Sequence, residues 1–268
     1  MGGWFLAIRG RVPRKAAALL GVVPILILIG LWWFFTRGAV EDRTIGPQIL
    51  PNPAEVVASI PELLTQRDLI HHVLSSLQRV GLGYLVALGI VLPLGVLMGS
   101  FASVRAIFSP SSTASGYIPI ATLVPLTMSW FGTDELQKVI FLAMAFGIYL
   151  LPLVVGAIEN VPDVYLKTGY TLGASRWQTV MRVLVPIAMP EIWHAMRLAF
   201  GVGWTYLVLT EVVVLTDGLG YLVAISQRRG PREHIYLVIV VITLIAWASD
   251  LAWTLVGRWL FRYKRSSP

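Results

Sequence analysis

The chain has 268 residues, of which 56% are hydrophobic and 13% charged, and its formal net charge is +7. A soluble domain carries about 25% charged residues, so this composition, with a mean hydropathy of +0.75, predicts an integral membrane protein and excludes a soluble one. The lysines and arginines stand at the ends of apolar runs, which indicates membrane topology and not nucleic-acid binding. The sequence has no cysteine, and its four histidines show no metal-ligand spacing, so no metal site is expected.

The first membrane span is predicted over residues 16–35, an apolar run of about 20 residues that can cross the hydrocarbon core. It follows a basic tail, residues 1–15, and ends in Trp32-Trp33-Phe34-Phe35, a group typical of the membrane interface. A signal peptide also combines a basic start with an apolar run. This run is long and has no small-residue cleavage site, so we interpret it as a retained helix.

Residues 37–70 are polar and rich in proline, and we expect them to lie at the outer interface with a short helix over 54–64. A glycine-rich apolar helix is predicted over 72–100, where small residues allow close helix contacts in lipid. Arg79, near its outer end, can extend its guanidinium to the interface or face a polar cavity. We favour the extension to the interface.

The third span, about residues 105–130, is apolar but contains hydroxyl side chains and prolines. Proline inside a membrane helix frees backbone carbonyl groups, which need protein, hydroxyl groups or water as partners. We therefore expect this helix to line a translocation pathway, although a kinked helix buried only for packing is an equally good interpretation. The candidate pathway residues of this span are Ser111, Thr113, Pro119, Thr122 and Pro125.

Three further spans are predicted over about 139–158, 192–215 and 235–256, which makes six in all. Ionisable side chains are costly inside a membrane and are functional candidates for that reason. Those of the last two spans are Arg197, Glu211 and Asp250. Arg197 stands too far from Glu211 to pair with it along one helix. Asp250, on another helix, is a possible partner of Arg197. A structural ion pair and a contact with the substrate both stay open.

The stretch 162–190, between the fourth and fifth spans, is too polar to cross a membrane and predicts two short helices. Asp163 is a suitable N-cap for the first helix, and Gly173 is expected to end it in the left-handed conformation. Ser175 and Gln178 have the spacing of a capping box and begin the second helix.

The second helix of this stretch is amphipathic. Trp177 belongs to the apolar face and is expected to anchor the helix on the protein. Arg176 and Arg182 belong to the opposite face, which is left free for a partner. Pro186 and Pro190 are expected to stop the helix.

The string T-L-G-A-S-R-W-Q at 171–178, followed by V-L-V-P and a second proline, resembles the EAA loop of binding-protein-dependent ABC importer permeases of the nitrate/sulfonate/taurine type. In that family the loop docks in a cleft of the cytosolic ATPase subunit. The W-F-G string at 130–132 and the G-L-G-Y string at 218–221 match the same family. The Glu-Ala-Ala triplet itself is replaced by Lys167-Thr168-Gly169, which reverses the charge at the glutamate position. By this resemblance, the residues that contact the ATPase are Lys167, Thr168, Gly169, Leu172, Gly173, Ala174, Ser175, Arg176, Trp177 and Arg182.

The resemblance implies an all-α integral membrane protein with the type I ABC importer permease fold, with residues 1–268 forming one transmembrane domain. It implies a homodimer in the bacterial inner membrane, with two cytosolic ATPase subunits and an extracytoplasmic solute-binding protein. The sequence has no G-x-x-x-x-G-K-[ST] string. ATP and Mg²⁺ are therefore expected in the partner ATPase, and this chain is expected to be neither an enzyme nor a cofactor carrier. The solute is expected to be small, with an anion such as nitrate, a sulfonate or taurine as the candidate.

Most of the lysines and arginines outside the spans lie in the two terminal tails, at Arg105 and in 162–190, which places all of these in the cytoplasm. The group Arg228-Arg229-Arg232 is an exception on the outer side. The alternative function is a proton-coupled secondary transporter that uses Glu211 or Asp250 as a relay. We favour the importer permease, because such a transporter has no need of a basic, capped helix pair between two spans.

Overall fold

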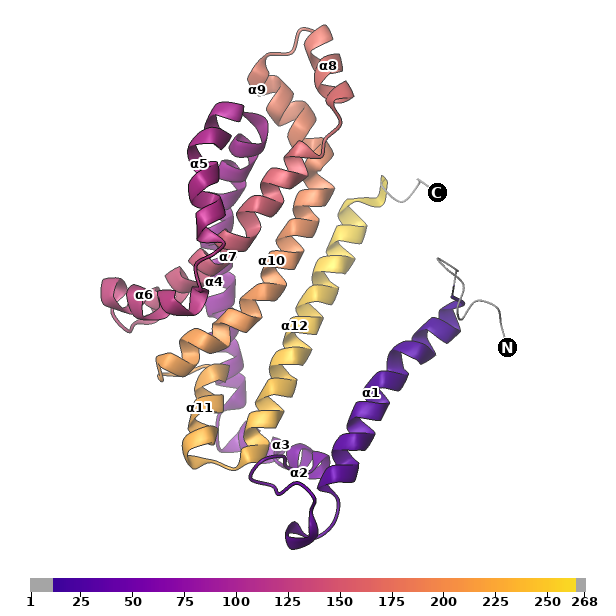
Figure 1. Ribbon diagram of the computed structural model, residues 1–268, viewed down its shortest axis with the longest axis vertical. Helices are drawn as coiled ribbons and strands as arrows, with labels where there is room; N and C mark the ends of the chain where they lie inside the picture. Colours follow the sequence, from indigo (N-terminus) through magenta and orange to yellow (C-terminus); the bar gives the residue numbers. More distant parts are fainter. Residues whose placement is uncertain (1–11, 264–268) are drawn as a thin grey trace. The chain divides into compact units, whose positions relative to one another are not determined.

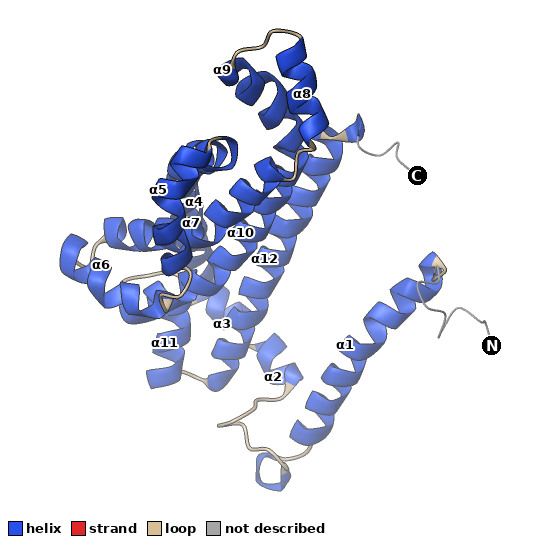
Figure 2. Ribbon diagram, turned by 45° about the horizontal axis from the view of Figure 1, so that its top comes forward, coloured by secondary structure: helices blue, strands red, loops and turns tan. Residues whose placement is uncertain are grey.

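The computed structural model describes residues 12–263, and no strand occurs among them (Figure 1, Figure 2). Most of the predicted basic tail lies outside the described residues. The long helices are α1 (Arg14–Thr36), α4 (Leu69–Ser100), α7 (Glu135–Glu159), α10 (Val185–Val213) and α12 (Arg232–Leu260). The shorter helices are α2 (Pro53–Ala58), α3 (Ile60–Thr65), α5 (Ala102–Ser115), α6 (Leu123–Phe131), α8 (Asp163–Thr171), α9 (Arg176–Thr179) and α11 (Leu219–Arg229). Three further turns are η1 (Val40–Asp42), η2 (Ile120–Thr122) and η3 (Val180–Leu184).

The described chain forms two compact units. The first comprises Met1–Arg67 and Ser226–Leu237, and the second comprises Asp68–Ile225 and Val238–Pro268. The core of the second unit lies where α7 packs against both α4 and α10. Side chains that fill it include Val80, Tyr84, Phe141, Phe146, Leu150 and Leu207.

The contact between α4 and α7 depends on small residues, as predicted for the glycine-rich helix. A Cβ atom on Gly83 would lie 2.7 Å from Cβ of Leu142 and 3.0 Å from the carbonyl oxygen of Val139. Lipid supplies no hydrophobic drive between helices, so close van der Waals contact of this kind helps to hold them together.

Within residues 12–263, five helical segments are long and apolar enough to cross a membrane: Lys15–Thr36, Leu69–Ser100, Glu135–Glu159, Arg176–Val213 and Arg232–Leu260. The predicted third span, 105–130, is different. The structure divides it into α5 and α6, joined by a turn through Gly116 and η2. Neither helix reaches the roughly 20 residues that one span requires. Pro119 has extended backbone at the start of η2, and its ring disfavours helix at Ile118 and provides no N–H, so α5 does not continue into α6.

The first unit contains α1 and the short helices of the polar segment 37–70. The helix predicted over 54–64 is two helices, α2 and α3, which meet at Ser59. Asn52 and Glu55 form a capping box at the start of α2. Arg43 donates hydrogen bonds of 3.1 and 2.7 Å to the Glu55 carboxylate and lowers its pKa.

Candidate functional site

The polar hairpin, residues 162–190, contains the predicted docking element, and the end of α8 fixes its first bend. The amide of Ala174 donates to the carbonyl of Gly169, and the amide of Gly173 donates to that of Tyr170, each at 3.0 Å. This pair of bonds is a Schellman motif. Gly173 has φ +78°, so the predicted left-handed residue is confirmed.

The start of the second helix, α9, is also as predicted. The Ser175 side chain accepts a hydrogen bond from the amide of Gln178, and the Gln178 side chain accepts one from the amide of Ser175. The prediction for the first helix is wrong by one residue, because Pro162 takes the N-cap position and Asp163 is the first helical residue. The Asp163 carboxylate still lies in the first turn, where it interacts favourably with the helix dipole.

The two prolines that were predicted to stop the second helix do not do so. The chain continues from α9 through the π-helical turn η3 into α10, and Arg176–Val213 forms one continuous helical segment. In an α-helix the ring of Pro186 would meet a carbonyl group of the preceding turn. The wider π-helical turn ends two residues before this proline, and such turns occur frequently at functional sites. The hairpin is therefore joined to a membrane span without a loop.

The side of the hairpin that packs on the bundle differs from the predicted apolar face, because Thr179 is buried whereas Trp177 and Met181 are exposed. Thr179, Val180 and Leu184 are buried, whereas Trp177 is 58% exposed and does not anchor the helix. Of the predicted ATPase-contacting residues, Gly169 is buried and Ala174 is half-buried. The exposed ones are Lys167, Thr168, Leu172, Gly173, Ser175, Arg176, Trp177 and Arg182. Basic and large apolar side chains of the hairpin are thus exposed at the end of the second unit.

A buried group of charges lies at the opposite end of the same unit. Arg79 is only 2% exposed, so the prediction that its guanidinium extends to the interface is wrong. It donates to Glu135 at 2.6 Å, to Glu211 at 2.7 Å, and to Asp217. Lys138, also buried, donates to Glu135 at 2.9 Å. We call these five residues the charge cluster; it joins α4, α7, α10 and the turn after α10.

Glu211 is the most buried member of the charge cluster, with a fully buried side chain. Its carboxylate also accepts hydrogen bonds from the Ser76 hydroxyl at 2.8 Å and from the amide of Gly220 at 2.8 Å. Buried charges are tolerated when they are paired and their hydrogen bonds are satisfied, and both conditions hold here. A role for Glu211 in a pathway stays a prediction.

The turn between α10 and α11 is held by side chains of α4. The amide of Gly218 donates to Nδ1 of His72, and the amide of Leu219 donates to the Ser76 hydroxyl, each at 2.9 Å. A Cβ atom on Gly220 would lie 2.7 Å from Cβ of Glu211. The helix α11 follows, in the segment between the fifth and sixth predicted spans, for which the sequence predicts no helix.

Asp217 completes the charge cluster from outside the membrane-spanning helices. Partial burial by itself would raise the pKa of its carboxyl group, but hydrogen bonds from Arg79 and Ser75 and the charges of Arg79 and Lys138 lower it to about 2. Asp217 is therefore ionised at any physiological pH.

The interhelical pair of Arg197 and Asp250, which the sequence left open, is present. Arg197 of α10 donates to Asp250 of α12 with Nε–Oδ1 and Nη2–Oδ2 distances of 2.5 and 2.7 Å. The two oxygens accept from two nitrogens, which is the geometry of a strong arginine–carboxylate pair. The pair is half-exposed, so it is less buried than Arg79 and Glu211 in the charge cluster.

The pathway candidates of the predicted third span all lie on exposed positions of α5, η2 and α6 or beside them. A cavity of about 470 Å³ opens next to Pro119. It is also lined by Tyr149 of α7 and Tyr206 of α10, whose rings stack and whose hydroxyls are 3.0 Å apart. The structure does not bring Ser111, Thr113, Thr122 or Pro125 into this cavity's lining.

Comparison with known proteins identifies the family. Residues 91–265 match the family described as binding-protein-dependent transport system inner membrane component. The chain belongs to this family. It is the permease component of an ABC importer, as its hairpin indicated.

The relatives of this permease include permease proteins named for taurine and for nitrate. It is 28% identical over 249 residues to the taurine transport system permease protein TauC of Escherichia coli (strain K12), covering 91% of this chain and 89% of that protein. It is 23% identical to the nitrate import permease protein NrtB of Leptolyngbya laminosa, covering 89% of this chain and 85% of that protein.

The fold of the permease is that of type I ABC importer permeases. A structure of the MetNI methionine ABC transporter in an inward-facing conformation matches 75% of this chain and 98% of that chain, with a TM-score of 0.66 and 19% identity. At this identity the likeness concerns the fold alone. The individual roles of the hairpin and pathway residues stay predictions.

Proposed function

We propose that the polar hairpin is the element through which a separate ATPase drives this permease. The observation that carries the proposal is the exposed, doubly capped hairpin that continues without a loop into α10. Its Schellman motif and capping box make it rigid, and its free surface presents Arg176, Arg182 and Lys167. A cleft with acidic residues is the chemistry that complements this surface. The reversed charge at Lys167 suits such a cleft.

The connection to α10 gives the hairpin a mechanical role. From Val185 to Glu211 the helix rises by roughly 40 Å at 1.5 Å per residue. One helix thus extends from the hairpin to the charge cluster at the other end of the unit. A displacement of the hairpin would be transmitted along α10, past Tyr206 in the cavity beside Pro119. Coupling in this sense requires two states of the permease. The contacts between the hairpin and the ATPase must differ between these states, so that ATP binding favours one of them.

We further propose the assembly that the resemblance implies. Two copies of residues 1–268 form a homodimer in the bacterial inner membrane, with the hairpins and both termini in the cytoplasm. Two ATPase subunits bind ATP and Mg²⁺, and an external binding protein delivers the solute. Closed two-fold symmetry is the commonest assembly of identical subunits. A purified complex is expected to weigh as two permeases plus two ATPases, and an active one-to-one particle would contradict this assembly.

The proposed solute is a small anion such as nitrate, a sulfonate or taurine, which is supported by the names of the relatives. The proposed pathway runs beside Ser111, Thr113 and Thr122. Cysteines at these exposed positions are expected to react with water-soluble thiol reagents in a manner that changes when ATP and loaded binding protein are added. A cysteine in place of buried Ala145 is the unreactive control. Equal reactivity in all states at all three positions would exclude them from the pathway.

A proton-coupled transporter has less support than the ATP-driven permease. A relay carboxylate must gain and lose a proton during transport. Glu211 is held by Arg79, and Asp250 by Arg197, so in this arrangement neither carboxylate is free to act as a relay.

The coupling role is tested by ATP turnover in vesicles that contain the permease, its ATPase and loaded binding protein. Gly173→Val places a β-branched residue at φ +78°, which costs about 1–2 kcal/mol and misdirects the hairpin. Arg176→Glu reverses an exposed charge. Both variants are expected to insert normally but to lose stimulation by binding protein. Gly173→Asn and Arg176→Lys are the matched controls, because asparagine tolerates the left-handed region and lysine keeps the charge. Full stimulation in Gly173→Val and Arg176→Glu would refute the proposal.

A further inference from the structure

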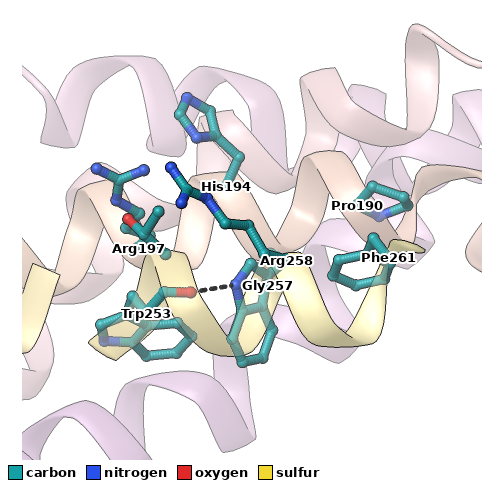
Figure 3. Close-up of a pocket in the computed structure, with 9 residues that line it drawn as sticks. Pro190, His194, Arg197, Trp253, Gly257, Arg258 and Phe261 are labelled. Carbon is teal, nitrogen blue, oxygen red and sulfur yellow. Dashed lines mark hydrogen bonds between the residues drawn. The ribbon is translucent and has the colours of Figure 1, made fainter. Parts of the chain in front are cut away.

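A cavity of about 350 Å³ lies between α10 and α12, away from the charge cluster and from the cavity at Pro119. One wall is aromatic, with Trp193 donating a hydrogen bond of 3.1 Å to the carbonyl of Trp253, and with their rings 4.5 Å apart. Phe261 extends this wall, its ring 6.2 Å from that of Trp193. Figure 3 shows the cavity with these helices behind its lining residues.

The other wall of the cavity is basic. His194, Arg197 and Arg258 line it, and in Figure 3 their side chains gather on one side of the two helices. Asp250 compensates the charge of Arg197. Arg258 has no ion pair with any described residue, so the cavity keeps an uncompensated positive charge. An arginine and an imidazole placed together offer several N–H donors to a phosphate group.

A second cavity of about 310 Å³ continues from the first along the same two helices. The two share Trp193 and Trp253, and the second is otherwise lined by Phe200, Ser249, Ala252 and Val256. From Arg258 to Ala252 the helix rises by roughly 9 Å. Neighbouring side chains of α12, such as Leu251, Leu255 and Trp259, are exposed and apolar, as expected for a surface in contact with acyl chains.

We propose that these joined cavities bind one anionic phospholipid of the membrane. Its phosphate lies against Arg258 and His194, beside the Arg197–Asp250 pair, and an acyl chain follows the apolar cavity over Trp253 towards Phe200. A free inorganic anion would use the basic cavity but would leave the apolar one without a function. The order of the two cavities, basic near the hairpin and apolar deeper in the span, is the order of a lipid headgroup and its chain. The proposal requires membrane insertion but not the coupling role of the hairpin.

Native mass spectrometry of the purified permease in detergent tests the site, with added dioleoyl phosphatidylglycerol or dioleoyl phosphatidylcholine. We expect one molecule of the anionic lipid to remain bound under conditions that remove the zwitterionic lipid. Arg258→Gln should weaken its binding about tenfold, the size of one lost charge-assisted hydrogen bond. The control is Arg262→Gln, one turn further along the chain, which does not line either cavity. Equal losses in the two variants would show nonspecific attraction and overturn the proposal.

A second variant distinguishes the lipid from a free anion. Ala252→Trp fills the apolar cavity and leaves the basic residues unchanged, so it should weaken the binding of phosphatidylglycerol. Millimolar inorganic phosphate should not displace the lipid from the unaltered permease. If phosphate does displace it, or if Ala252→Trp binds the lipid normally, the site belongs to a free anion and the proposal is wrong. Circular dichroism checks that each variant keeps its helix content, and a variant that loses it is replaced by Arg258→Met or Ala252→Phe.

Discussion

Replacing Glu211 with glutamine removes the negative charge at the centre of the charge cluster. The carboxylate is fully buried and accepts from Arg79 at 2.7 Å, from Ser76 at 2.8 Å and from the amide of Gly220 at 2.8 Å. A glutamine amide has the same shape, but its NH₂ group would face some of these donors. Arg79 would lose its most buried partner.

The expected loss of stability follows from what remains around Arg79. Breaking a buried ion pair by removing one partner costs about 3–5 kcal/mol. Glu135 and Asp217 still contact the guanidinium, so we expect the lower end of this range, about 3 kcal/mol. For a chain of this size that corresponds to a fall in Tm of roughly 6–12 °C.

The assay is thermal unfolding of the purified permease in detergent, followed by circular dichroism. Glu135→Gln is the matched control, because Glu135 contacts the same arginine but its side chain is 59% exposed, and exposed pairs contribute at most about 1 kcal/mol. The double variant Arg79→Met with Glu211→Leu should recover part of the loss, since it leaves no unpaired buried charge between these two positions. A Glu211→Gln variant that is no less stable than Glu135→Gln would refute the reasoning.

Three further predictions concern other parts of the second unit. The ionised carboxylate of Asp217, with its pKa of about 2 against an ordinary value of 3.8, stabilises the fold above pH 4 and loses this contribution as the pH falls towards 2; Asp217→Asn should therefore flatten the fall in Tm over this range. Exchanging the charges, Arg197→Asp with Asp250→Arg, should give a free energy of unfolding about 0.5–1 kcal/mol higher than the sum of the two single-variant effects predicts. A double variant whose loss of stability equals that sum would contradict the pairing. Gly220→Ala should lower stability by about 1–3 kcal/mol because its Cβ would lie 2.8 Å from a backbone carbonyl, whereas Gly89→Ala, with no atom within 4 Å, should have no such effect in the same unfolding assay.

Much of the hairpin could be predicted from the sequence, because its geometry depends on residues within a few positions of one another. The left-handed Gly173 and the Ser175–Gln178 capping box are both present. The prolines misled the prediction. Pro186 lies at the start of α10, just after the π-helical turn, and Pro190 lies inside α10, so the helix continues through both. The exposure of Trp177 likewise depends on which face of the hairpin meets the bundle, and periodicity alone did not determine that.

The sequence by itself determined that the chain is a helical membrane protein and where its long spans lie, because span length and apolarity are local properties set by the thickness of the bilayer. Only the tertiary structure decided the environment of Arg79. Its partners come from positions 56, 132 and 138 residues away, and no local pattern relates them. An arginine inside a span can extend to the interface or pair with carboxylates, and the choice depends on whether other helices bring their carboxylates to the same depth. That is a property of helix packing, and here α7, α10 and the turn after α10 supply the carboxylates.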